Sequence, residues 1–219
     1  MKDTQTTNEA NKNTGNLISG VQSYMMDIEQ AFDGIPDERK NQLEEIAAYV
    51  KEKTDANKNV PMTYICTHNS RRSHMSQVWA QTAAHYYQIP NVQCYSGGTE
   101  ATAFNPRAVK AMKKAGFTIE RTEDTTNPIY LVSYSKEAEP LKCFSKRFED
   151  DFNPQKGFAA IMTCSQADEA CPFVPGAEVR FSIPYEDPKV ADNTPAEEAK
   201  YDERCRQIAT EMFYLFSKV

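Results

Sequence analysis

The segment Cys66-Thr-His-Asn-Ser-Arg-Arg-Ser73 constrains this chain most, because it places a cysteine six residues before an arginine and a serine directly after that arginine. A short apolar run over residues 61–65 precedes the segment, and a helical apolar pattern follows it over residues 73–89. A loop between a strand and a helix can surround a tetrahedral oxyanion with backbone N–H groups and a guanidinium. The helix N-terminus and the guanidinium also favour a thiolate, so we expect Cys66 to be the nucleophile.

The other residues of this loop have distinct expected roles. Arg72 is expected to clamp the oxyanion, and Asn69 tolerates the left-handed backbone that a tight cradle needs. The Ser73 hydroxyl can donate to the Cys66 thiolate and hold it ionised. The residues expected to bind the oxyanion are Thr67, His68, Asn69, Ser70, Arg71 and Arg72.

Composition excludes several classes of function. The chain has 219 residues, a net charge of −6 and 26% charged residues, so neither a nucleic-acid nor a membrane-surface role is favoured. We see no secretory signal and no apolar stretch long enough to span a bilayer. Six cysteines in a chain of this length are too sparse for a disulfide scaffold and fit a reducing compartment, so we expect a cytoplasmic protein. Their spacing predicts no metal site.

Alternating strand and helix patterns predict an α/β fold. Apolar runs over residues 61–65, 92–95, 129–134 and 158–163 predict strands, and residues 194–216 predict a long closing helix. We therefore expect a four-stranded parallel sheet flanked by helices. Residues 1–15 are expected to be a mobile polar tail, residues 16–58 a helical N-terminal extension, and residues 59–219 the catalytic domain. An insertion near residues 122–156 has no assigned role.

Two further motifs carry chemistry. Cys164 ends the apolar run before it, so its thiol is expected at the same sheet edge as Cys66, and Cys171 follows seven residues later. Three neighbouring thiols suggest a relay in which Cys164 attacks the sulfur of Cys66 and Cys171 then attacks Cys164. Asp187, before Pro188, is the candidate general acid, with a pKa raised by a bound oxyanion. The competing interpretations are coincidental buried thiols at 164 and 171, and an ordinary turn at Asp187.

Together these motifs resemble the low-molecular-weight protein tyrosine phosphatase superfamily, and within it the thioredoxin-coupled arsenate reductases. The resemblance runs from about residue 60 to the C-terminus and includes Ser96-Gly-Gly-Thr-Glu-Ala and Asn105-Pro-Arg-Ala-Val-Lys-Ala-Met. It implies Cys66 as nucleophile, Arg72 as clamp and Asp187 as acid. It also implies that Ser96 hydrogen-bonds Asn69, and that Cys164 and Cys171 form a relay pair that phosphatases of this fold generally lack.

The resemblance implies reduction of arsenate to arsenite, with no bound cofactor and with an external dithiol such as thioredoxin as reductant and partner. Gln77 stands where some of these reductases have an acidic potassium ligand, so we do not expect that ion. His68 and Arg71 also depart from the usual glycine and cysteine. The alternatives are a phosphatase that works through a phosphocysteine at Cys66, and a non-enzymatic redox sensor or adaptor that uses an exposed apolar stripe on residues 17–50.

Overall fold

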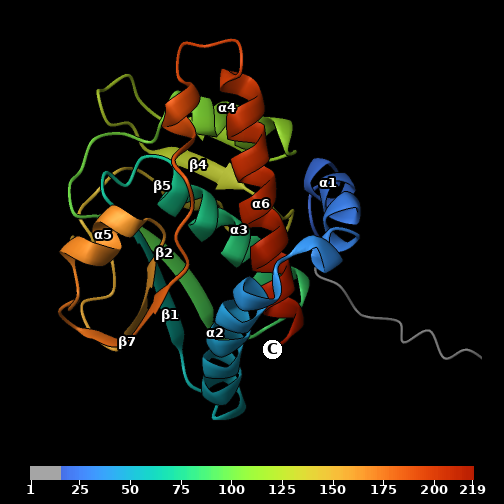
Figure 1. The fold of residues 1–219 in the computed structure, drawn as a ribbon, viewed down its shortest axis with the longest axis vertical. Helices are drawn as coiled ribbons and strands as arrows, with labels where there is room; N and C mark the ends of the chain where they lie inside the picture. Colours follow the sequence, from blue (N-terminus) through green and yellow to red (C-terminus); the bar gives the residue numbers. More distant parts are fainter. Residues whose placement is uncertain (1–15) are drawn as a thin grey trace, which may run out of the picture.

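The computed structural model describes residues 16–219, so the predicted tail over residues 1–15 lies outside the described part of the chain. A four-stranded sheet forms its centre, and every neighbouring pair of strands is parallel (Figure 1). Its strands, in spatial order, are β2 (Val92–Gly98), β1 (Val60–Cys66), β6 (Phe158–Met162) and β7 (Ala177–Ser182). The predicted α/β fold with a four-stranded parallel sheet flanked by helices is therefore confirmed.

The helices are α1 (Ser19–Glu29), α2 (Asp37–Asp55), α3 (Arg72–Tyr86), α4 (Pro106–Lys114), α5 (Ser165–Ala170) and α6 (Glu197–Ser217). Two short 3-10 helices, η1 (Phe32–Gly34) and η2 (Pro188–Ala191), complete the helical elements of the described residues. The α4 helix shows how local sequence sets a boundary, because Asn105 caps it through its side chain and Pro106 occupies its first turn.

Alternation along the buried strands divides the core into two layers. On one face of the sheet, Met62, Tyr64 and Ile161 join a large cluster with α2, α3 and α6. On the other face, Ile65, Ala160 and Met162 join a smaller cluster that also contains Cys66 and Cys164. Successive strand residues point to opposite faces, which accounts for the alternation of Tyr64 with Ile65 and of Ile161 with Met162. Cys66 departs from this alternation, because it ends β1 and joins the same cluster as Ile65.

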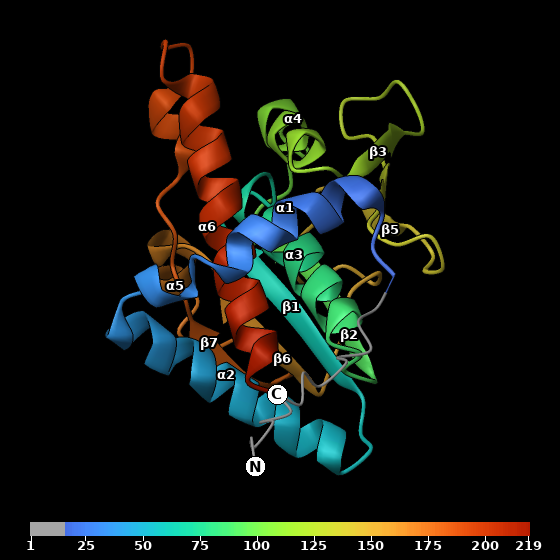
Figure 2. The same cartoon turned by 90° about the vertical axis from the view of Figure 1, so that its right-hand side faces the viewer.

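The apolar faces of the two N-terminal helices are buried in the larger cluster. Val21 and Ile28 of α1 and Leu43 and Val50 of α2 have no exposed surface. Figure 2 shows α1 and α2 crossing α6, and both helices contact it. An adaptor would need an exposed apolar stripe on residues 17–50, and these four residues are buried instead. The helices before residue 58 therefore share one hydrophobic core with the rest of the chain.

The prediction for residues 129–134 was wrong about which sheet this strand joins. Strand β4 (Tyr130–Ser133) forms a separate antiparallel sheet between β3 (Thr118–Arg121) and β5 (Leu141–Cys143). The fourth strand of the central sheet is instead β7, whose residues are mostly half-buried because it lies at the edge. The predicted insertion thus contributes β4 and β5 to a small second sheet, which β3 completes from just before the insertion.

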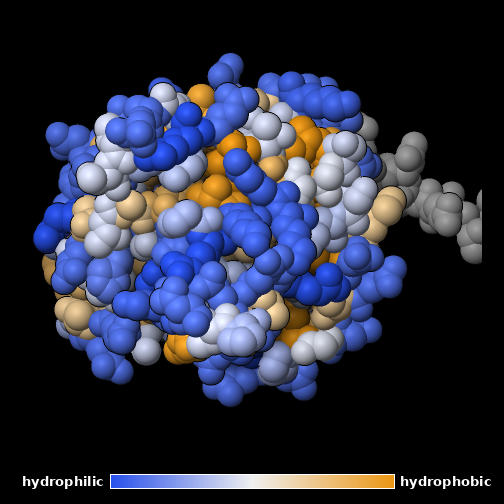
Figure 3. Space-filling view, turned by 90° about the horizontal axis from the view of Figure 1, so that it is seen from above, coloured by the Kyte–Doolittle hydropathy of each residue, from blue (hydrophilic) through white to orange (hydrophobic). Residues whose placement is uncertain are grey.

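The surface seen from above is mostly hydrophilic, with small separated apolar patches (Figure 3). Within residues 16–219 no helix is long and apolar enough to cross a membrane. The described residues also contain no group of three or more His, Cys, Asp and Glu side chains placed to hold a metal ion.

Candidate active site

The loop after β1 places Cys66 at the carboxyl end of the sheet. Cys66 is the last residue of β1, α3 begins at Arg72, and Asn69 between them has a positive φ of 44°. The predicted left-handed residue is therefore confirmed at Asn69. The loop encloses one small pocket, which is lined by Cys66, His68, Ser70, Arg71, Arg72 and Asp187.

Gly98, at the end of the neighbouring strand β2, lets the loop lie this close. A Cβ atom at residue 98 would stand 2.7 Å from the backbone nitrogen of Asn69 and 2.2 Å from the carbonyl oxygen of Glu100. Real Cβ atoms do not approach backbone atoms so closely, so the position requires glycine. The Ser96-Gly-Gly segment therefore contributes backbone space to the loop.

The Cys66 sulfur lies 3.1 Å from the Ser73 hydroxyl, as predicted. The side-chain amide of Asn69 donates to the same hydroxyl oxygen at 2.9 Å. Because that oxygen already accepts a hydrogen bond from Asn69, the hydroxyl proton is free to point at the sulfur. Cys66 is only 3% exposed, so this donor acts where water does not compete.

The predicted hydrogen bond between Ser96 and Asn69 was wrong. The Ser96 hydroxyl lies 3.2 Å from Nδ1 of His74, and the Asn69 carbonyl oxygen accepts from the backbone N–H of Lys146 at 2.9 Å. The His74 ring is buried and stacks on Phe104, with the ring centroids 4.2 Å apart. Burial lowers the pKa of His74 well below its usual value, and Lys146 lowers it further, so a neutral ring fills the space beside Ser96.

Lys146 and Ser145 are site residues that the sequence analysis missed. The Ser145 hydroxyl donates to the carbonyl oxygen of His68 at 2.9 Å, and the Lys146 backbone pairs with Gly98. These contacts come from within the predicted insertion, just after β5, and they support the loop from the side of β2. No side-chain motif identified them, because two of the bonds use backbone groups that every residue has.

Asp187 lies over the loop, held by both loop arginines. Its carboxylate contacts Nη2 of Arg72 at 2.8 Å and Nε of Arg71 at 2.8 Å. Burial by itself would raise the pKa of Asp187, but Arg72, Arg71 and the N–H of Lys189 together hold it below its usual value. The raised pKa that was expected for Asp187 thus requires a bound oxyanion that competes for the same two guanidinium groups. Without a bound oxyanion the Asp187 carboxylate is ionised.

Cys164 and Cys171 lie in or against the buried cluster that contains Cys66. Cys164 follows β6, the parallel neighbour of β1, and its sulfur lies 3.5 Å from the hydroxyl of Thr67, the residue after Cys66. Cys66 and Cys164 belong to one buried cluster, and the half-buried Cys171 packs against it. Cys164 precedes α5 and Cys171 follows it, so this short helix separates them.

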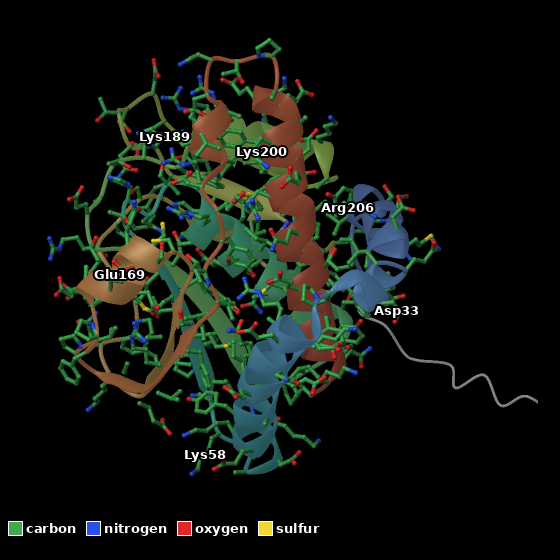
Figure 4. All side chains as sticks on the ribbon, in the orientation of Figure 1. Asp33, Lys58, Glu169, Lys189, Lys200 and Arg206 are labelled. Carbon is green, nitrogen blue, oxygen red and sulfur yellow. The ribbon has the colours of Figure 1, made fainter. Side chains whose placement is uncertain are left out.

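The segment between Cys164 and Cys171 is tied to the edge strand. Arg180 of β7 pairs with the Asp168 carboxylate and donates to the carbonyl oxygen of Cys171 at 3.1 Å. Ser182 donates to the second Asp168 oxygen at 2.8 Å. Burial raises the pKa of Cys171, and Arg180 partly opposes this. Figure 4 labels Glu169, which lies on α5, and Lys189, which follows the Asp187-Pro188 pair.

The remaining cysteines lie in packed surroundings. Cys94, Cys143 and Cys205 are buried, and burial raises the pKa of each thiol. A buried neutral thiol is a poor nucleophile, so these three are suited to packing.

The chain is similar to several curated arsenate reductases. It is 31% identical over 156 residues to the arsenate reductase of Bacillus licheniformis, which covers 71% of this chain and 93% of that protein. It is also 31% identical over 135 residues to the arsenate reductase of Halalkalibacterium halodurans, which covers 61% of this chain and 78% of that protein. No protein-family model matches the chain.

Solved structures share its arrangement only distantly. A YwlE mutant from Bacillus subtilis aligns with a TM-score of 0.49 at 14% identity, over 73% of this chain and 97% of that chain. The Corynebacterium glutamicum thioredoxin-dependent arsenate reductase aligns with a TM-score of 0.37 at 14% identity, over 86% of this chain and 92% of that chain.

Proposed function

The chain belongs to the arsenate reductase family, and from this membership and its site geometry we propose that it reduces arsenate to arsenite through Cys66, Cys164 and Cys171. The observation that carries the proposal is that Cys66 and Cys164 share one buried cluster at the carboxyl ends of adjacent strands. A phosphatase needs only the first of these thiols, whereas a reductase needs a second sulfur to accept the nucleophile's bond.

In the first step the Cys66 thiolate bonds to arsenic, and one arsenate oxygen leaves as water. Arg72 and the loop N–H groups hold the remaining oxygens, and the Ser73 hydroxyl keeps the sulfur ionised before attack. Asp187 supplies a proton to the departing oxygen. An incoming oxyanion draws Arg71 and Arg72 away from Asp187, and its negative charge raises the proton affinity of that carboxylate.

In the second step the Cys164 thiolate attacks the Cys66 sulfur, and the sulfur–arsenic bond breaks. The electron pair of that bond remains on arsenic, which leaves as arsenite, while the two sulfurs form a disulfide. Cys171 then attacks the Cys164 sulfur, which frees Cys66 as a thiolate and leaves a Cys164–Cys171 disulfide. An external dithiol such as thioredoxin reduces this disulfide and becomes oxidised.

The attack of Cys171 on the Cys164 sulfur requires α5 to rearrange. A helix rises about 1.5 Å per residue, so two cysteines at its opposite ends are about 10 Å apart along its axis. A disulfide needs Cα atoms within about 7 Å. We therefore propose that α5 unwinds as Cys171 approaches Cys164, which would break the contacts of Asp168 with Arg180 and Ser182.

The free thiols also support a reducing location. All six cysteines of the chain are unpaired in the structure. This pattern is typical of a reducing compartment, and we place the protein in the cytoplasm on that ground.

A side-by-side assay tests the proposal. Wild type and Cys164→Ser are compared for arsenate turnover with thioredoxin as reductant and for hydrolysis of p-nitrophenyl phosphate, with Cys94→Ala as a control for loss of a buried thiol. We expect Cys164→Ser to lose arsenate turnover while it keeps any ester hydrolysis that the wild type shows. Equal arsenate turnover by wild type and Cys164→Ser would reject the relay.

A further inference from the structure

Arg39, on the second N-terminal helix, contacts the segment that carries Asp187. Its Nη2 donates to the carbonyl oxygen of Pro184 at 2.7 Å, and its guanidinium lies 5.0 Å from the centre of the Tyr185 ring. The Arg39 side chain is only 12% exposed. The planar guanidinium donates a hydrogen bond at its edge and packs its face on the ring, so it fixes both the Pro184 carbonyl group and the tilt of the Tyr185 ring.

Glu211 of α6 holds Arg39 in this place. Its carboxylate lies 3.0 Å from Nε of Arg39, and the Glu211 side chain is 5% exposed. Burial raises the pKa of Tyr185 well above its usual value, and the charge of the neighbouring Glu211 raises it further. Arg39 of α2 thus joins Glu211 of α6 to Tyr185, which lies in the segment between β7 and η2 that carries Asp187.

The network reaches the pocket through Arg72. The Tyr185 carbonyl oxygen accepts from Nη1 of Arg72 at 2.9 Å, and the Asp187 carboxylate lies 2.8 Å from Nη2 of the same guanidinium. Tyr185 is therefore fixed by Arg39 on one side and by the oxyanion clamp on the other. A displacement of Tyr185 would move Asp187, which is two residues further along the chain.

We propose that Arg39 and Glu211 are a positioning pair, which sets the 184–187 segment so that Asp187 reaches the departing oxygen. This inference rests on the proposed acid role of Asp187. It also gives α2, the second N-terminal helix, a task in the reaction, because α2 supplies the guanidinium and the C-terminal helix α6 supplies the carboxylate.

A double-mutant cycle with Asp187→Asn tests the pair. Arg39→Met keeps the aliphatic stem and should lower kcat for arsenate about 10- to 100-fold, with KM changed less than about twofold, because a misplaced catalytic group costs about that much. In an Asp187→Asn background the same change should lower kcat by less than about twofold, because the acid it positions is already gone. If Arg39→Met caused only a structural defect, it would lower kcat by the same factor in the wild-type and Asp187→Asn backgrounds.

Two further variants separate positioning from loss of the fold. Arg39→Lys keeps the charge opposite Glu211 but lacks the planar fork, so it should retain the thermal midpoint of the wild type and show a smaller loss of kcat that again disappears in Asp187→Asn. Arg206→Met is the matched control. Arg206 of α6 donates to the Asp27 carbonyl oxygen of α1 at 3.2 Å and lies beside α1 in Figure 4, so its loss should leave kcat within about twofold.

The outcomes separate the two proposals. Equal losses for Arg39→Met in both backgrounds, or no loss in either, would overturn the positioning pair while leaving the acid role intact. Wild-type kcat in Asp187→Asn alone would overturn the acid role, and the positioning pair with it.

Discussion

The Asp187 carboxylate lies 2.8 Å from Nη2 of Arg72, so the proposed acid and the proposed oxyanion clamp are an ion pair with each other. Arg71 adds a second guanidinium to the same carboxylate. A bound oxyanion must therefore replace Asp187 on the arginines. In the proposed mechanism Asp187 holds the two arginines as an internal anion, and its proton affinity rises only when substrate binds.

This ion pair predicts a pH-dependent contribution to stability. Because the folded-state pKa of Asp187 lies below its usual value, the contribution is complete above pH of about 4 and is lost as the pH falls through the folded-state pKa. Asp187→Asn should lower the free energy of unfolding at pH 7 by about 1 to 3 kcal/mol. The gap to wild type, measured by urea unfolding, should narrow below about pH 4.

Asp124→Asn is the control for this measurement. Asp124 also contacts an arginine, at 2.9 Å from Arg121, but its side chain is 97% exposed. An exposed pair contributes little, so this variant should match wild type at every pH. A gap for Asp187→Asn that stays constant from pH 7 to pH 3 would contradict the expected role of the ion pair.

Ser73→Ala is predicted to slow the chemistry of Cys66 while leaving the fold intact. The change removes the hydroxyl 3.1 Å from the sulfur, and a hydrogen bond to a charged group contributes about 1.5 to 3 kcal/mol. The rate of Cys66 alkylation by iodoacetamide at pH 7 and the value of kcat should both fall about 10- to 100-fold.

Ser76→Ala provides a matched control on the same helix. Its hydroxyl is buried and has no hydrogen-bond partner, so its removal should leave alkylation, turnover and stability close to those of wild type. Unchanged alkylation in Ser73→Ala would show that the helix and Arg72 suffice to activate the thiol.

Cys171→Ser is predicted to stop the relay after one turnover. Without the third thiol, the Cys66–Cys164 disulfide cannot be passed on, and it should accumulate in proportion to one arsenite released per chain. Non-reducing mass spectrometry of a peptide digest should show this disulfide, whereas Cys94→Ala should continue to turn over. Multiple turnovers by Cys171→Ser at the wild-type rate would mean that the reductant attacks the first disulfide directly.

The sequence predicted the site best where a particular residue type is required by the local backbone or by the local chemistry. Cys66, Arg72 and Ser73 gained their predicted roles from their place between a strand and a helix, and Asn69 was expected to tolerate the left-handed backbone it adopts. The edge strand β7 was missed because its Ala-Glu-Val-Arg-Phe-Ser sequence mixes charge with apolar residues, which suits a half-buried edge and gives only a weak pattern.

Contacts made by backbone groups could not be predicted from residue types. The Lys146 N–H that holds Asn69 would be present at any residue except proline, so only the fold reveals it. The hydrogen bond of Ser96 could not be predicted either, because its partner is the ring of His74, and the loop sequence does not show that this ring is buried beside Ser96. Lysine is among the residues least often buried, so its residue type gives no sign that Lys146 is buried.

Lys146 gives the last prediction, because its side chain is 2% exposed and still carries an ammonium. That group lies 4.5 Å from the Phe144 ring centre and 5.2 Å from that of Phe152, and donates to the Phe144 carbonyl oxygen at 3.3 Å. Burial lowers the pKa of Lys146 to about 8, although Cys143 and Asp150 act in the opposite direction. Keeping this lysine charged at pH 7 therefore lowers the free energy of unfolding of the chain.

The sign of the pH dependence follows from the two pKa values of this lysine. Between pH 8 and 10.5 the folded state binds fewer protons at Lys146 than the unfolded state, so the contribution of this group to stability rises with pH across that window. Lys146→Met keeps the backbone N–H on Asn69 and removes the charge. It should raise the free energy of unfolding at pH 7 by as much as about 3 kcal/mol, and by about half as much at pH 9.5.

Urea unfolding of wild type, Lys146→Met and the exposed control Lys142→Met at pH 7 and pH 9.5 provides the measurement. Turnover should be unchanged in Lys146→Met, because the loop is held by the backbone of residue 146 and not by its side chain. If Lys146→Met is less stable than wild type at pH 7, the contacts of the ammonium with the two rings and the carbonyl outweigh its burial. In that case the lysine stabilises the support of the loop through its charge.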